Sequence, residues 1–369
     1  MATDLSTLSL FPATPEQITV ARRRTLHEWG KGLTMEEHLA RDASQDQFDG
    51  SRDGRLTTWY AGREYGFHLR SLIWRFKGAS AERGPADPGL QVRMRDVSLV
   101  VDPAKNKGAE TVTCYGIASV FTPLENRGNG FASHMMRLLH WVIADESLLP
   151  SSKFPAAWGT PPLKVDGTRN GRFSGLWSDV GDFYSSCGPV HGKREGMGDQ
   201  RYRNDHDAGV SKLWEEDAGK MRADMEKSEH PGISFAYLPI QGVASFQHRR
   251  LEIFLQRLPV PPQTWGVAST DRTAYATWTI DPRPPALRTL TVSRVRADPQ
   301  NFRGLVGKIL EVARKHDVKR IEMWNLPVKL EILAGTFGAA THSREEHLPA
   351  FKFYGEGPEA EISWAFNER

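Results

Sequence analysis

Helical and extended patterns alternate along the first half of the chain. A cap-like Thr14-Pro-Glu-Gln17 precedes a helix predicted through Val20 to Trp29, which we expect to line the substrate side. Apolar alternation predicts hairpin strands within residues 56–74, including 67–74. Further strands are expected at residues 92–101 and 111–121. The predicted order is helix, several strands of one sheet, and then a second helix.

That second helix follows Gly130, and its residues divide into two faces. Met135, Leu138, Leu139 and Val142 recur at helical spacing and predict the face that packs on the sheet. The polar residues of this helix fall on the opposite side, where a solvated face is expected: His134, Arg137 and His140.

Residues 192–230 differ from the rest of the chain in being dense in charge and poor in aliphatic residues. An apolar stripe in their second half predicts a helix with one narrow buried face, formed by Trp214, Ala218, Met221 and Met225. A solvated connecting helix is the ordinary interpretation, and a mobile lid has no specific signal.

The last third repeats the style of the first. Strands are predicted at 275–280 and 290–295, a long helix at 301–314, a strand at 318–324 and a short helix at 328–334. The domains expected are therefore 1–192, a charged connecting segment 193–232, and 233–369.

The most informative local feature is the junction between the strand ending at Phe121 and the helix after Gly130. Gly128 and Gly130 allow a sharp turn and a close approach to a bulky anion. The helix that follows offers unpaired N–H groups and the positive end of its dipole, which suit a pyrophosphate. Arg127 adds a possible charge-assisted bond to phosphate. An ordinary glycine-rich turn with a surface arginine is the alternative.

Arg127-Gly-Asn-Gly-Phe-Ala132 resembles the Arg/Gln-x-x-Gly-x-Gly/Ala pattern of GNAT-type acetyltransferases. Tyr184 begins a Tyr-x-x-x-Gly sequence after the predicted strand 173–178, where these enzymes carry a tyrosine that protonates the departing thiolate of coenzyme A. Longer phrases look like the fungal lysine N-acetyltransferases of lysine catabolism, at residues 115–132, 176–184, Leu56-Thr-Thr-Trp59 and Glu322-Met-Trp-Asn325.

This resemblance implies a mixed α/β acetyltransferase domain with acetyl-CoA as donor substrate. It also favours interpreting the last third as a second, degenerate GNAT-like domain, because Arg303 to Lys308 echoes the phosphate loop without matching it. An unrelated α+β appendage is the alternative. The residues expected to contact acetyl-CoA are Val120, Phe121, Arg127, Gly128, Asn129, Gly130, Phe131, Ala132 and Ser133.

The acceptor implied by the resemblance is free L-lysine, with its side-chain amine favoured. The amine attacks the thioester directly while the N–H groups near Val120 and Phe121 polarise the thioester carbonyl. The alternative acceptors are a lysine or N-terminus within a protein, or another small amine, and an acyl-CoA sensor without catalysis is the alternative to an enzyme. The general base stays open among Glu110, Glu125, Asp179 and a water chain.

Composition adds few constraints. The 369 residues are 39% hydrophobic and 25% charged, and the net charge of +3 gives no reason to expect nucleic acid. Two cysteines, Cys114 and Cys187, are too few for a disulfide framework, and no metal site is expected. Because neither a membrane-spanning run nor a secretory leader is recognisable, we expect a cytoplasmic protein without membrane partners.

Overall fold

The structure is a computed structural model of the 369-residue chain. It describes residues 4–48, 51, 55–63, 89–101, 108–191, 198–199, 211–228, 230–324, 326–355 and 361–366. The strand predicted at 67–74 lies outside these residues, as does most of the charged segment before residue 211. The side chains of 89–99 are likewise outside the description.

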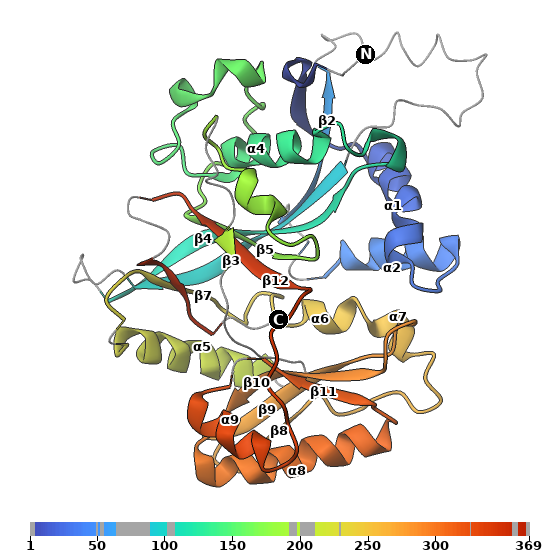
Figure 1. Cartoon of the computed structure of the whole chain (residues 1–369), viewed down its shortest axis with the longest axis vertical. Coiled ribbons are helices and arrows are strands. Elements are labelled where there is room, and N and C mark those ends of the chain that lie inside the picture. Colours follow the sequence, from blue (N-terminus) through green and yellow to red (C-terminus); the bar gives the residue numbers. More distant parts are fainter. Residues whose placement is uncertain are drawn as a thin grey trace.

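A large mixed sheet forms the upper half of the molecule in Figure 1. Along its main path the strands follow the order β1-β2-β3-β4-β5-β12-β6, and β7 joins β3 on one side and β13 on the other. Their bounds are β1 Leu8–Pro12, β2 Leu56–Arg63, β3 Gly89–Val101, β4 Ala109–Phe121, β5 Phe173–Ser178, β6 Gly198–Asp199, β7 Ser234–Tyr237, β12 Leu348–Phe353 and β13 Ser363–Trp364.

Three helices accompany this sheet near its amino-terminal strands. α1 (Pro15–Trp29) has the predicted cap, since Thr14 and Gln17 each bond the other's backbone N–H. α2 (Met35–Gln45) packs beside it and starts with a second capping box at Thr34. α4 (Phe131–Ile143) covers one face of the sheet, as Figure 1 shows. Short 3-10 helices lie at Leu5–Thr7, Leu124–Asn126, Ser151–Lys153, Ala156–Trp158 and Phe183–Ser186.

α4 is buried on both of its faces, so the predicted solvated face is wrong. His134 is 3% exposed and His140 is fully buried. The His140 ring lies between the Tyr354 hydroxyl, 2.7 Å from Nδ1, and the Cys187 carbonyl, 3.0 Å from Nε2. Burial lowers the pKa of His140 to about 3, so this ring is neutral. Polar side chains of α4 can face the interior because their polar atoms have hydrogen-bond partners there, as both ring nitrogens of His140 do.

A separate four-stranded sheet occupies the lower half of Figure 1, in the order β11-β10-β9-β8. The predicted strands and helices of the last third are all present here. Their bounds are β8 Gly266–Ala268, β9 Tyr275–Asp281, β10 Thr289–Arg296, α8 Pro299–Lys315, β11 Arg320–Met323 and α9 Val328–Gly335. Two short helices, α6 (Phe246–Arg249) and α7 (Glu252–Leu255), precede this sheet.

The chain then returns to the large sheet. β12 pairs antiparallel with β5, from Leu348 opposite Ser178 to Phe353 opposite Phe173. Aromatic stacking holds it there, with the Phe173 ring 4.3 Å from that of Phe235 and 4.8 Å from that of Phe353. The first sheet therefore extends beyond the first domain proposed from the sequence, because its strands β7, β12 and β13 lie after residue 232.

α5 (Ser211–Glu226) connects the two sheets and buries the predicted stripe of Trp214, Met221 and Met225. Its Arg222 guanidinium donates to the Thr111 hydroxyl on β4 at 2.9 Å. Its Asp217, fully buried, binds Arg294 and Arg296 of β10. The charged connecting helix is therefore an integral part of the core. None of the helices in the described part of the chain is both long enough and apolar enough to cross a bilayer.

Candidate active site

The site begins with an irregularity near the end of β4. Ser119 has a left-handed backbone, with φ of 57°, and the register against β3 shifts there because Ser119 and Val120 both lie opposite Leu90. This is a β-bulge, which bends the strand and changes where its backbone groups point. β4 pairs with β5 from Cys114, opposite Phe173, as far as Gly116, opposite Gly175. Past that pair the described residues show no β4–β5 pairing, so the last residues of β4 have one edge available to a ligand.

The glycine-bearing loop lies directly after this strand end. Gly128 and Gly130 have φ values of 78° and 81°, which only glycine adopts readily. An added Cβ at Gly128 would meet no atom within 4 Å, so that position faces open space. Both glycines therefore adopt the sharply turned backbone that was expected of them from the sequence.

The first turn of α4 has the donor groups that a pyrophosphate requires. Gly130 is its N-cap and supplies no side chain, and the first helical bond runs from the His134 N–H to the Gly130 carbonyl at 3.0 Å. The N–H groups of the three residues before His134 are therefore left without a partner in the helix, namely those of Phe131, Ala132 and Ser133. These residues fit the pyrophosphate of a coenzyme A thioester.

Arg127 and Asn129 are already engaged within the loop region. The Arg127 Nη2 lies 2.6 Å from Glu28 Oε1 of α1, and its Nε donates to the Thr122 carbonyl at 3.0 Å. The Asn129 amide folds back on the Arg127 carbonyl at 3.3 Å. Arg127 therefore fixes the loop against α1, and its half-exposed guanidinium stays accessible to an anion.

Tyr184 lies on the 3-10 helix Phe183–Ser186 rather than on an α-helix. The Arg137 guanidinium of α4 donates to the Ser186 carbonyl at 3.2 Å, and the Ser133 hydroxyl bonds the buried Cys187 thiol. These contacts hold the tyrosine beside the helix that starts at the phosphate loop. Its ring packs on the core formed by β4 and α4. The structure thus places the segment of Tyr184 beside the helix that follows Gly130, so the two sequence motifs lie together.

Burial raises the pKa of Tyr184 to about 12, with further contributions from the nearby Cys187 and Asp179. The hydroxyl is therefore protonated at neutral pH and is available as a proton donor. The Asp179 carboxylate contacts His347, and the 3-10 helix has Asp182 at its N-cap without a side-chain cap bond.

Val120 and Phe121 complete the predicted set. Val120 packs against the same core as Tyr184, and the Phe121 ring meets the Trp29 ring of α1 edge-on, with centroids 6.1 Å apart.

Of the three candidate bases, Glu110 pairs with Val100 at the opposite end of β4. It lies six residues before Gly116, about 20 Å along an extended strand.

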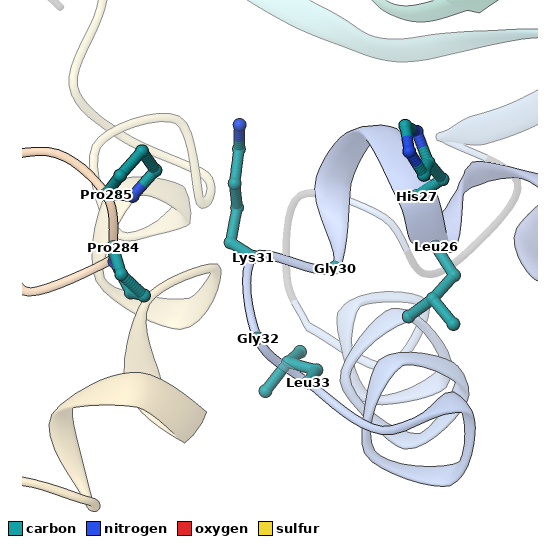
Figure 2. Close-up of a pocket in the computed structure, with 8 residues that line it drawn as sticks. All are labelled: Leu26, His27, Gly30, Lys31, Gly32, Leu33, Pro284 and Pro285. Atoms are coloured by element: carbon teal, nitrogen blue, oxygen red, sulfur yellow. The ribbon is translucent and has the colours of Figure 1, made fainter.

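A pocket of about 460 Å³ lies between the end of α1 and the turn after β9. Figure 2 shows the Lys31 side chain extending between His27 on α1 and the two prolines opposite. The lining residues are Leu26, His27, Gly30, Lys31, Gly32, Leu33, Pro284 and Pro285. The first helix was expected to lie near the substrate. Lys31 could not be identified from the sequence, because the opposite side of the pocket is formed by Pro284, from a distant part of the chain.

This pocket adjoins the glycine-bearing loop after β4 through α1. Glu28 and Trp29, which contact Arg127 and Phe121, lie between the lining residues His27 and Gly30. Arg257 closes the other side, where its guanidinium donates to the Gly32 carbonyl at 3.4 Å and pairs with Glu37 of α2. Only His27 and Lys31 among the lining residues are ionisable, so an anionic ligand group is favoured there.

Comparison with known proteins gives the class of protein. Residues 204–369 match the family model described as "LYC1 GNAT-like C-terminal domain". The resemblance to GNAT-type acetyltransferases is thus confirmed, together with a mixed α/β fold of that class.

The chain is also similar to individual proteins. The chain is 28% identical over 174 residues to a protein named lysine acetyltransferase from the yeast Yarrowia lipolytica, and the match spans 47% of this chain and 38% of that protein. Among solved structures it is similar to a GCN5-related N-acetyltransferase from Kribbella flavida, at 15% identity and a TM-score of 0.43, over 94% of this chain and 72% of that one. It is also similar to Eis1 from Mycobacterium abscessus, at 14% identity and a TM-score of 0.41, over 94% of this chain and 73% of that one.

Proposed function

We propose that this chain transfers the acetyl group of acetyl-CoA to an amine, and that the acceptor is the side-chain amine of free L-lysine. The observation that carries the transfer is the meeting of the uncapped first turn of α4 with Tyr184 beside the diverging ends of β4 and β5. The first turn binds the pyrophosphate, and Tyr184 donates to the sulfur that leaves. The name of the yeast relative supports an acceptor that is a lysine.

In this reaction the neutral amine attacks the thioester carbonyl directly, and backbone N–H groups near Val120 and Phe121 stabilise the developing oxyanion. With an ordinary lysine pKa of ~10.4, only about one molecule in ~2,500 is neutral at pH 7. A group that accepts the ammonium proton therefore accelerates the reaction.

A free amino acid rather than a peptide is favoured by the pocket at the end of α1. Its ionisable lining residues, Lys31 and His27, are both basic, and they suit the carboxylate of a free amino acid. An internal lysine of a protein has no carboxylate at its own Cα. The pocket therefore supports a free amino acid over a lysine within a protein as the acceptor.

The direct test is release of coenzyme A thiol from acetyl-CoA with free L-lysine and, in parallel, with a lysine peptide blocked at both ends. We expect release with free lysine, and mass spectrometry should locate the acetyl group on the side-chain amine. Release with the peptide alone would establish the protein-modifying alternative. No thiol release with either substrate, while acetyl-CoA still binds, would refute lysine as the acceptor.

Replacing Lys31 with Gln is expected to raise the KM for L-lysine about 10-fold, or ~1.4 kcal/mol, because one charge-assisted contact to the carboxylate is lost. The kcat and the Kd for acetyl-CoA should change little. A diamine of the same chain length, which lacks the carboxylate, should not distinguish the variant from the wild type. Lys153→Gln, at an exposed 3-10 helix, is the matched control. An equal KM increase for lysine and the diamine would contradict carboxylate binding by Lys31.

A further inference from the structure

An aspartate and a histidine meet where β5 ends and β12 begins. Asp179 follows Ser178, the last residue of β5, and His347 precedes Leu348, the first residue of β12. The His347 Nδ1 lies 2.8 Å from Asp179 Oδ1, and the His347 backbone N–H donates to the same oxygen at 2.9 Å. With Nδ1–H directed at the carboxylate, Nε2 is the ring nitrogen that can accept a proton.

The pair lies at the strand end that borders the candidate site. β5 has separated from β4 after Gly175, and its last residues are paired with β12 alone among the described strands. A tight turn then leads from Ser178 to the helix of Tyr184, with the Ser178 hydroxyl donating to the Gly181 carbonyl at 2.9 Å. Asp179 is thus five residues before Tyr184 and on the same strand-to-helix connection.

Contacts from the second sheet fix the position of His347. The Arg344 guanidinium donates to the His347 carbonyl at 2.9 Å and stacks on the Trp324 ring, 3.7 Å from its centroid. The Trp324 indole in turn donates to Glu322 at 3.3 Å. Glu322 and Trp324 belong to one of the phrases on which the lysine acetyltransferase resemblance rests. The segment that returns from the second sheet to β12 therefore places His347 beside the end of β5.

We propose that His347 is the general base of the acetyl transfer and that Asp179 is its positioning residue; this inference rests on the proposed function. His347 Nε2 takes one proton from the acceptor ammonium and releases it to water, since the side chain is 36% exposed. The neutral amine then forms the C–N bond as the C–S bond breaks. The second amine proton leaves with the thiol, so the products are amide, thiol and one proton.

The charges around His347 are consistent with this role. Asp179 faces the ring from β5, Arg344 faces the main-chain carbonyl, and Glu345 and Glu346 precede it in the chain. The neutral Tyr184 is the titratable group on the neighbouring 3-10 helix. The carboxylate in contact with Nδ1 orients the ring and leaves Nε2 as the nitrogen that accepts the proton.

The test compares wild type, His347→Gln and Asp179→Asn with the amine that the wild type acetylates fastest. We expect His347→Gln to lower kcat/KM about 10- to 100-fold at pH 7.5, with the deficit shrinking toward pH 10 as the amine loses its own proton. The Kd for acetyl-CoA should stay within about twofold. Asp179→Asn should lower kcat/KM as well, but less than His347→Gln does, because the ring remains and loses only the carboxylate that orients it. His342→Gln, on the same connection, is the control.

Nitrogen NMR of the His347 ring gives a measurement that needs no turnover. The wild type should show the tautomer protonated at Nδ1, and Asp179→Asn should reduce the share of that tautomer. A wild-type pH profile in His347→Gln, or an equal loss at every pH, would overturn the proposal. So would a tautomer ratio unchanged by Asp179→Asn. Lack of turnover with every amine would overturn the proposed function and, with it, this role; turnover with an amine other than lysine would overturn only the acceptor.

Discussion

Replacing Tyr184 with Phe is expected to lower kcat about 100- to 1,000-fold, because the variant cannot donate to the sulfur that becomes negative in the transition state. The Kd for acetyl-CoA should change less than about twofold, since the ring and its packing remain. Thiol release gives the kcat, and calorimetry gives the affinity.

Tyr115→Phe is a matched control for this substitution. The Tyr115 hydroxyl donates to the Asn170 side chain at 2.6 Å, within the core beside α4. Its loss should lower stability by about 1 kcal/mol and leave kcat nearly unchanged. Equal losses of turnover and coenzyme affinity in Tyr184→Phe would contradict a role confined to the transition state.

The pKa of Tyr184, raised to about 12 mainly by burial, also defines how the residue acts. An ordinary thiol has a pKa of ~8.5, so complete transfer of the tyrosine proton to a free thiolate costs about 5 kcal/mol. In the proposed reaction, Tyr184 therefore stabilises the leaving sulfur by hydrogen-bond donation while charge develops. Because the hydroxyl stays protonated up to about pH 11, activity should rise with pH through the neutral range as more acceptor amine becomes neutral.

The parts of the fold that were predicted from the sequence are those specified by nearby residues. Thr14 and Gln17 cap α1 from three positions apart, and the stripe of Trp214, Met221 and Met225 is a repeat within one helix. The phosphate loop is equally local, since Gly128 and Gly130 need only their own left-handed backbones. Such features are encoded within about ten residues, so their pattern is visible without the tertiary structure.

The features that escaped prediction depend on distant segments. His140 was assigned to solvent because helical periodicity cannot show that Tyr354 and Cys187 cover the second face of α4. The pairing of Asp179 with His347 joins residues 168 positions apart. It exists because β12 returns to the first sheet, and a pattern of alternation gives no information about which strand will be the neighbour. The general base could not be chosen from the sequence for this reason.

A second large effect is expected at the contact between α5 and the second sheet. Asp217 is fully buried and binds Arg294 Nε at 2.6 Å and Arg296 Nε at 2.7 Å. Arg294 is itself 4% exposed and also donates to the Tyr275 hydroxyl. Asp217→Ala would leave two guanidinium groups without their shared carboxylate, which should lower the free energy of unfolding by about 3–5 kcal/mol.

Urea denaturation of the wild type, Asp217→Ala and Asp224→Ala measures this loss. Asp224 also binds Arg296, at 2.8 Å, but its side chain is 43% exposed, so its removal should cost under about 1 kcal/mol. Burial alone would raise the pKa of Asp217, but Arg294 and Arg296 outweigh it and hold the pKa below its ordinary value. The carboxylate's contribution is then complete above about pH 5 and declines as the pH falls below ~4, toward the folded-state pKa. The gap between wild type and Asp217→Ala should therefore narrow in acid; a gap that stays constant with pH would show that the loss comes from packing rather than from charge.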